Sequence, residues 1–290
     1  YDSFPSNEEM FAKLKAGGAD YDICFPSGDY VSIMIKEGML APIDRSKLAN
    51  YGNIDKDVLA RCDFDPGNVY SVPYYMGAAG VAVNKTKVPV FERSWSIFGR
   101  KDLAGKMTML DDMREVLGDA LAYSGKSVNS VSDADLELAR RVVEKEWLPN
   151  LLKFDAEAFA KGFAAGEFWV VQGYAESIYA EIDPAKRGDV EFFIPKEGGP
   201  MYIDSMVVLK DSKNKDLAHA FIDFIHRPEM YAEFVDAFGF PAPCNVPARA
   251  LKKGDAWYTA EALEPCELKA DVGAGLEKYN AIWQEIRVGK

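Results

Sequence analysis

The stretch IPKEGGPMYIDSMVVL, residues 194–209, decides how the rest of the chain is organised. Its prolines and glycines predict a turn, and the β-rich run that follows predicts a strand over 201–209. Side chains alternate along a strand, so Tyr202 and Asp204 should point to the same side. An aromatic ring beside a carboxylate suits an organic cation, because the ring offers its quadrupole and the acid its charge. A half-buried strand with an acid at its edge is an equally simple interpretation.

Length and charge limit the number of domains and the classes of partner. A chain of 290 residues is long for one compact core, which predicts two domains. It carries 34 basic and 46 acidic residues, a net charge of −12. This balance argues against nucleic acid as a partner, which needs a basic surface, and suits the attraction of cations. No apolar run reaches the roughly 18–20 residues of a membrane span.

The four cysteines, Cys24, Cys62, Cys244 and Cys266, are too sparse for a disulfide framework and show no C-x-x-C spacing. Cys24 lies in an apolar run and is predicted to be a core residue. Pairing among the other three stays open, and so does the redox compartment.

Near the N-terminus, the sequence predicts a helix, a strand and a second helix. Ser6 and Glu9 have the spacing of a capping box that opens a helix ending at the glycines 17–18. The run YDICF (21–25) predicts a buried strand that leads through a turn into a helix ending near residue 38. Ligands of open α/β sheets sit beyond the carboxyl ends of strands, which makes Ser27 and Asp29 candidates. At least one of them should cap the helix, and a cap can also contact a ligand.

The run VYSVPYYMGAAGVAVN (69–84) predicts a long extended segment that leaves one domain and enters the next. Its glycines lack the G-x-G-x-x-G spacing, so they do not indicate a dinucleotide site. Together with the crossover at 201–209, it predicts two α/β domains that exchange the chain more than once. Sites in such proteins lie between the domains.

The second domain offers an acid pair and an aromatic residue. A strand over 106–110 should lead into a helix ending near 125, where Asp112 and Glu115 share a face at the positive N-terminus. The same spacing resembles a capping box, and both roles are compatible. Tyr174 follows a predicted strand over 167–172 in the same way, or is a packed aromatic. The remaining patterns predict helices, at 133–152, 155–165, 217–226, 228–238 and 276–287.

Several segments together resemble the periplasmic spermidine/putrescine-binding proteins, the solute receptors of polyamine ABC importers. The similarity is carried by SNEEMFAKLKAGGADYDICFPS, KEGMLAPIDRSKLANYGNID, YSVPYYMGAAGVAVN, LDDMREV, IPKEGGPMYIDSMVV and ADVGAGLEKYNAIWQEI, in unbroken order. The resemblance implies an α/β, two-domain type II periplasmic binding protein fold with the ligand cleft between the domains. The first domain is expected over 1–78 and 204–247, and the second over 79–203 and 248–290.

The resemblance also implies roles for single residues. The family's first-domain serine falls on Ser27, the ring that sandwiches the ligand's methylenes on Tyr174, and the G-Y-P aromatic on Phe240. The implied ligand-binding set is Ser27, Asp29, Asp112, Glu115, Tyr174, Tyr202, Asp204 and Phe240.

This sequence departs from the family pattern in four places. Tyr174 replaces a tryptophan, Tyr202 stands where Trp or Phe is frequent, and Phe240 lacks the tyrosine hydroxyl. Lys269 stands where some members have a glutamine. A lysine directed into the site would repel a cation, so we expect Lys269 to face away. The family's opening strand has no counterpart, and the sequence is expected to begin at the family's second strand.

The function implied is binding of a linear polyamine, spermidine or putrescine, and its delivery to a membrane permease. The protein is expected to be a periplasmic monomer, free or lipid-anchored, without a cofactor and without enzymatic activity. The acid pair Asp112 and Glu115 favours the longer triamine, although the sequence does not decide between the two ligands.

Two alternatives remain at this stage. A carboxylate-dependent hydrolase would use Asp112 and Glu115 as acid and base, but both lie on one helix turn and no G-x-S-x-G motif occurs. A receptor of the same fold for a metal (ferric) ion or another cationic solute is the second alternative. A metal site would need more ligands than His219 and His226, which are seven residues apart on one helix. The adjacent tyrosines 74–75 lie in the crossover, where packing is the simpler role.

Overall fold

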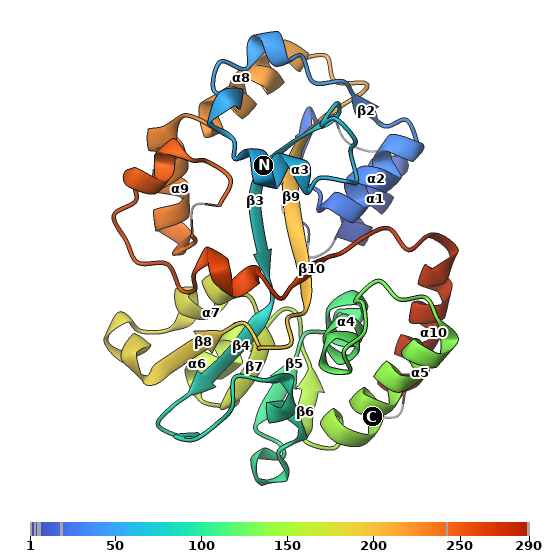
Figure 1. Ribbon diagram of the computed structural model, residues 1–290, viewed down its shortest axis with the longest axis vertical. Helices are drawn as coiled ribbons and strands as arrows, with labels where there is room; N and C mark the ends of the chain where they lie inside the picture. The colour runs from blue at the N-terminus through green and yellow to red at the C-terminus, as the bar shows by residue number, and fades with distance from the viewer. Residues whose placement is uncertain (1, 3, 5–6, 18–19, 242, 289–290) are drawn as a thin grey trace. The chain divides into compact units, whose positions relative to one another are not determined.

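The computed structural model describes residues 2, 4, 7–17, 20–241 and 243–288 (Figure 1). The chain forms two compact units, unit 1 with Tyr1–Gly77 and Tyr202–Ala256, and unit 2 with Ala78–Met201 and Trp257–Lys290. It therefore passes from one unit to the other three times. These units differ from the expected domain bounds at Ala78, which lies in unit 2, and at residues 202–203 and 248–256, which lie in unit 1.

The sheet of unit 1 is built on β9 (Pro200–Leu209), which includes the predicted strand at 201–209. β1 (Ile23–Cys24) and β2 (Leu40–Ala41) pair with it antiparallel, and β3 (Ser71–Ala78) pairs with it as well. The first two residues of β9 belong to unit 2 and pair there, in parallel, with β10 (Glu267–Leu268).

In the described part of unit 1, the helices that pack on this sheet are α1 (Asn7–Lys15), α2 (Gly28–Lys36), α3 (Lys56–Ala60), α8 (Lys215–Ile225) and α9 (Pro228–Phe238). α2 buries Val31 and Met34 against Val207 of β9, and α8 buries Ile222 against Met206. The predicted capping residue Ser6 lies outside the described residues.

The sheet of unit 2 has the strand order β6-β5-β7-β4-β8. Its strands are β4 (Gly80–Asn84), β5 (Met107–Met109), β6 (Leu151–Phe154), β7 (Val170–Gly173) and β8 (Val190–Phe193). β5 runs parallel to β6 and β7, so the carboxyl ends of β5 and β7 meet at one edge of the sheet. The expected single extended segment at 69–84 is divided into β3 and β4.

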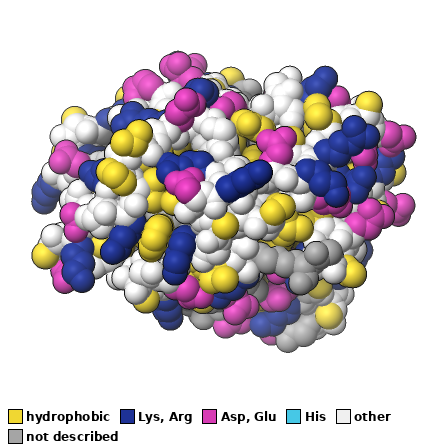
Figure 2. Space-filling view, turned by 90° about the horizontal axis from the view of Figure 1, so that it is seen from below, with side chains coloured by type: hydrophobic (Ala, Val, Ile, Leu, Met, Phe, Trp, Pro, Cys, Tyr) yellow, Lys and Arg dark blue, Asp and Glu magenta, His cyan; other side chains and the backbone are white. Residues whose placement is uncertain are grey.

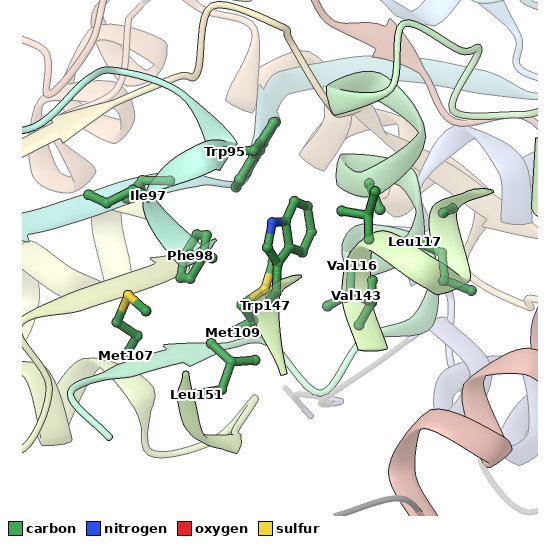
Figure 3. Packing of buried hydrophobic residues seen from close by; sticks show 14 of the residues in the cluster. Trp95, Ile97, Phe98, Met107, Met109, Val116, Leu117, Val143, Trp147 and Leu151 are labelled. Atoms are coloured by element: carbon green, nitrogen blue, oxygen red, sulfur yellow. The ribbon is translucent and has the colours of Figure 1, made fainter. Parts of the chain in front are cut away.

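The helices of unit 2 are α4 (Met113–Tyr123), α5 (Asp133–Arg141), α6 (Phe159–Ala165), α7 (Ala175–Glu181) and α10 (Leu276–Val288). Trp95, Phe98 and Trp147 are fully buried at the centre of its core, where aromatic rings supply much of the apolar area (Figure 3). α10 adds Tyr279 and Trp283 to the same cluster.

The predicted helix at 133–152 is wrong in its second half. α5 ends at Arg141, a π-helical turn covers Val142–Trp147, and β6 takes Leu151–Phe154. Pro149 cannot continue a helix, and Lys153 pairs with Thr108 of β5. A strand that short is specified by its distant partner more than by its own sequence.

Charged side chains of both signs are interspersed on the face shown in Figure 2. The net charge of −12 is therefore not displayed there as one acidic field. Within the described residues, every helix is too short or too polar to cross a bilayer.

Candidate functional site

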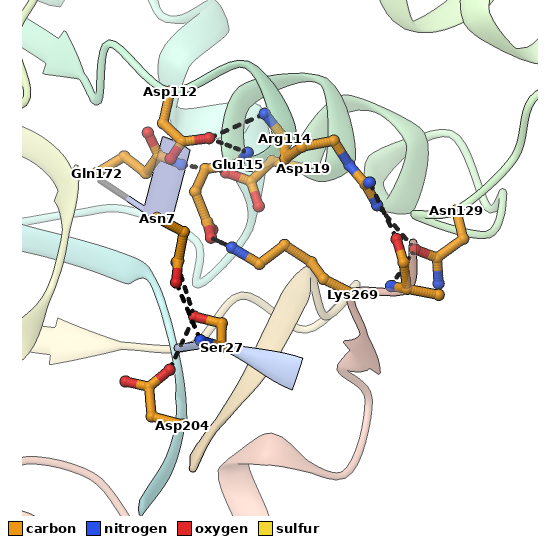
Figure 4. Close-up of polar contacts among 11 residues, drawn as sticks. Asn7, Ser27, Asp112, Arg114, Glu115, Asp119, Asn129, Gln172, Asp204 and Lys269 are labelled. Atoms are coloured by element: carbon orange, nitrogen blue, oxygen red, sulfur yellow. Dashed lines mark hydrogen bonds and ion pairs between the residues drawn. The ribbon is translucent and has the colours of Figure 1, made fainter. Parts of the chain in front are cut away.

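Ser27 and Asp204 are brought together in unit 1 (Figure 4). The Ser27 hydroxyl donates a hydrogen bond of 2.8 Å to Oδ1 of Asp204, and the two residues form an isolated antiparallel bridge. Asn7 completes the group, because its Nδ2 donates to the Ser27 hydroxyl at 3.0 Å and its Oδ1 accepts from the Ser27 amide at 3.1 Å. Neutral donors thus orient the Asp204 carboxylate. Asn7 was not predicted as part of this group, because its sequence context indicates only a place at the start of a helix.

Ser27 stands at the N-cap of α2, but its side chain makes no capping hydrogen bond. Ser27 therefore occupies the expected capping position, while its hydroxyl bonds to Asp204 rather than to a backbone amide of the helix. Asp29 lies in the first turn of α2 and is half-buried, where the helix dipole favours a negative charge. Gly28 is required between them, since a Cβ there would lie 2.4 Å from the Phe64 ring.

An aromatic group accompanies Asp204 in unit 1. Tyr202 is two residues earlier on β9, and its ring centroid is 6.1 Å from that of Tyr75. The Tyr75 ring stacks on Phe240 at 3.9 Å. All three rings are more than nine-tenths buried. The structure therefore joins Tyr202 and Phe240 through Tyr75, which the sequence analysis had assigned to packing.

In unit 2, Asp112 and Glu115 have separate roles. Asp112 caps α4, and its Oδ1 accepts from the amides of Arg114 (2.9 Å) and Glu115 (3.0 Å). The predicted cap by Asp112 is confirmed, whereas the Glu115 side chain pairs with Lys269 instead of completing a capping box. The Glu115 side chain is fully buried, and burial raises its pKa, an effect that the nearby Lys269 ammonium opposes.

Lys269 does not face away. Its Nζ lies 2.5 Å from Oε1 of Glu115, and its side chain is only 11% exposed (Figure 4). Repulsion of a ligand cation does not decide the position of Lys269, because the buried Glu115 carboxylate is stabilised by a counter-charge whether or not a ligand is bound. β10 delivers the lysine to this position, since the Lys269 amide donates to the Met201 carbonyl at 2.8 Å.

Asp119 is a further buried acid that the sequence analysis missed. It lies one helical turn beyond Glu115, is fully buried, and accepts a short hydrogen bond from Nε2 of Gln172 on β7. Burial and the neighbouring Glu115 charge raise its pKa well above the ordinary value. Gly199 packs against Asp119, since a Cβ on it would lie 2.7 Å from Oδ1. An acid four residues after Glu115, inside an apolar helix, was the available signal.

Tyr174 follows β7 and occupies the N-cap of α7, half-buried. Asp112 follows β5 in the same way. Because β5 and β7 are parallel neighbours, both residues lie at the same edge of the unit 2 sheet.

The histidines and cysteines have structural surroundings. His219 bonds to the Asp44 amide (2.9 Å) and the Lys215 carbonyl (2.6 Å), and His226 is buried against Tyr231. The four cysteines are free thiols. In the part of the chain that the structure describes, three or more His, Cys, Asp or Glu side chains nowhere group as metal ligands.

Comparison with known proteins places this geometry in a family. The family model for bacterial extracellular solute-binding proteins matches residues 3–265. A spermidine/putrescine-binding periplasmic protein of Escherichia coli is 34% identical over 299 residues, which cover 100% of this chain and 84% of that protein. A putrescine/cadaverine-binding protein of Pseudomonas aeruginosa is 34% identical over 251 residues, covering 83% of this chain and 70% of the relative.

Solved structures agree with the sequence matches. The crystal structure of the Tp0655 (TpPotD) lipoprotein of Treponema pallidum has a TM-score of 0.97 and 49% identity, and the alignment covers 99% of this chain and 91% of that one. This likeness confirms the predicted two-domain periplasmic binding protein fold. The chain belongs to the bacterial extracellular solute-binding proteins.

Proposed function

We propose that this protein is a periplasmic receptor that binds a linear polyamine and presents it to the membrane permease of an ABC importer. Relatives named for spermidine, putrescine and cadaverine binding support this proposal. The role is reversible binding by a single chain, without a chemical step, a cofactor or a nucleic-acid partner.

The hydrogen bond between Ser27 and Asp204 is the observation that carries the proposal in unit 1. A neutral hydroxyl at 2.8 Å orients the carboxylate without cancelling its charge, which an ammonium group can then meet. Tyr202 and Phe240 would cover the apolar spacer beside it, and Asp29 would add a second acid. A carboxylate beside aromatic rings matches the ammonium and methylene pattern of a polyamine.

In unit 2, the contacts would come from the sheet edge that carries Tyr174 and Asp112. Tyr174 would pack on methylene groups, and Asp112 keeps lone pairs that its capping bonds do not use. Glu115 is fully buried and pairs with Lys269, so it would act on the ligand indirectly. Charge-assisted hydrogen bonds contribute about 1.5–3 kcal/mol each, so a few of them, less the association cost, give micromolar binding or tighter.

Isothermal titration calorimetry against putrescine, spermidine, spermine and arginine tests the function. Saturable binding of at least one polyamine at micromolar concentration or below, with much weaker binding of arginine, is the expected result. The absence of binding heat with all three polyamines, from protein that is folded and ligand-free, would overturn the proposal.

The variant Asp204→Asn tests the site. We expect it to weaken polyamine binding more than tenfold, a loss above about 1.4 kcal/mol, because the amide keeps the shape but not the charge. The matched control is Asp22→Asn. Asp22 is also a half-buried acid of unit 1 that bonds a serine hydroxyl (Ser212, 2.6 Å) and an asparagine amide (Asn214). Equal affinities of the two variants would remove Asp204 from the site.

A further inference from the structure

Lys269 is positioned by a network of its own neighbours. Asn129 holds both flanking residues, since its Nδ2 donates to the Leu268 carbonyl at 2.9 Å and its Oδ1 accepts from the Ala270 amide at 2.9 Å. Arg114 donates to the Ala270 carbonyl at 3.1 Å and to Asn129 at 2.8 Å (Figure 4). A lysine whose backbone is fixed on both sides loses little further freedom when its ammonium meets Glu115.

The lysine also balances the local charge. The two fully buried carboxyl groups of α4 are Glu115 and Asp119. The Lys269 ammonium lies 2.5 Å from Oε1 of Glu115 and cancels the charge of that carboxylate. With the lysine in place, the Glu115–Lys269 pair is neutral. Without it, one buried negative charge would remain and would attract an external cation.

We infer that Lys269 is a tethered ammonium that replaces one ammonium of the ligand at Glu115, and that it makes this receptor select linear diamines over triamines. This inference rests on the proposed polyamine-binding function. A triamine brings one more positive charge than a diamine, and the carboxylate that would meet it is already paired. The acid pair alone had favoured the triamine, and the position of Lys269 reverses that expectation.

The test compares the ratio of the spermidine and putrescine dissociation constants in wild type and in Lys269→Gln. Wild type should bind putrescine at least tenfold more tightly. In Lys269→Gln the ratio should fall at least tenfold, through tighter spermidine binding, because Glu115 is released. In the double variant Glu115→Gln, Lys269→Gln this gain should disappear, since the released charge is gone.

Lys252→Gln is the matched control. The Lys252 side chain is 12% exposed and pairs with Asp236 at 2.9 Å, in unit 1, so the variant removes a comparable lysine elsewhere. Its ligand ratio should equal that of wild type. A shift as large as that of Lys269→Gln would show a general charge effect and overturn the inference.

Fluorescence gives an independent check on folding, because all five tryptophans belong to unit 2, where Lys269 lies. If Lys269→Gln is unfolded, Lys269→Met keeps the length of the apolar stem and makes the same prediction. An unchanged ratio in a folded variant that binds polyamines overturns the inference and leaves the proposed function standing. Loss of polyamine binding by the wild type would instead overturn the proposed function.

Discussion

The acids of the two units are treated differently by their surroundings. In unit 1, half-buried Asp204 is oriented by the neutral Ser27 hydroxyl, which is itself held by Asn7. In unit 2, fully buried Glu115 pairs with the Lys269 ammonium. The Ser27 hydroxyl orients a negative charge, and the Lys269 ammonium neutralises one. A carboxylate is therefore oriented by a neutral hydroxyl in one unit and neutralised by an internal ammonium in the other.

The largest effect should come from breaking the buried pair in unit 2. Glu115→Gln leaves the Lys269 ammonium buried without its carboxylate, which costs about 3–5 kcal/mol in the free energy of unfolding. Urea denaturation followed by tryptophan fluorescence measures this, since the five tryptophans all report on unit 2. Adding Lys269→Met should recover most of the loss, because no unpaired charge is then buried.

An exposed ion pair of unit 2 provides the control for this prediction. Asp133 pairs with Lys278 at 2.7 Å, but the Asp133 side chain is 87% exposed. Asp133→Asn should change the unfolding free energy far less than Glu115→Gln. Equal effects of the two variants would contradict the special role given to the buried pair.

A second contrast concerns the response to acid. Burial lowers the pKa of His226 in unit 1 to about 4, so the unfolded state binds more protons between pH 6.5 and 4. Its stabilising contribution is complete above pH 6.5 and is lost as the pH falls to 4, about 3 kcal/mol in all. The raised pKa values of Glu115 and Asp119 act with the opposite sign, because the folded state then holds more protons. Acid should therefore weaken unit 1 through His226, while Glu115 and Asp119 oppose acid destabilisation of unit 2.

Hydrogen exchange of α8 and α9, corrected for the intrinsic pH dependence, follows unit 1, while tryptophan fluorescence follows unit 2. In His226→Gln, the fall in unit 1 stability between pH 6.5 and 4 should be smaller by about 3 kcal/mol. Any packing loss in the variant lowers the stability of unit 1 by the same amount at every pH, so the pH dependence of stability can still be compared with that of the wild type. Parallel pH profiles of variant and wild type would exclude His226 as the cause.

The sequence predicted the parts of the fold that local patterns specify. The strand at 201–209, the cap at Asp112 and the two-domain fold are present in the structure. The pairing of Lys269 with Glu115 was missed because it depends on β10, a two-residue strand whose partner Met201 lies 67 positions away. The contact of Ser27 with Asp204 spans 177 positions, and only the family resemblance suggested a shared role. Short elements with distant partners carry too little local pattern to be predicted.

The smallest effect compares the two helix starts. Ser27 of α2 makes no side-chain cap, whereas Asp112 of α4 accepts two backbone amides. Ser27→Ala should therefore leave the exchange protection of α2 unchanged, while Asp112→Ala should lower that of α4 by about 1 kcal/mol.

Ser27→Ala should instead weaken polyamine binding by about 1 kcal/mol, roughly fivefold, because the Asp204 carboxylate loses a hydrogen-bonding partner. The loss is smaller than in Asp204→Asn because the charge remains and the Ser205 amide still bonds to the Pro26 carbonyl at 3.0 Å. Calorimetry measures polyamine affinity and hydrogen exchange measures the protection of α2, so the two effects of Ser27→Ala are read separately on the same samples. A variant that loosens α2 but binds polyamines as wild type does would make Ser27 a helix residue and leave Asp204 to be oriented by other groups.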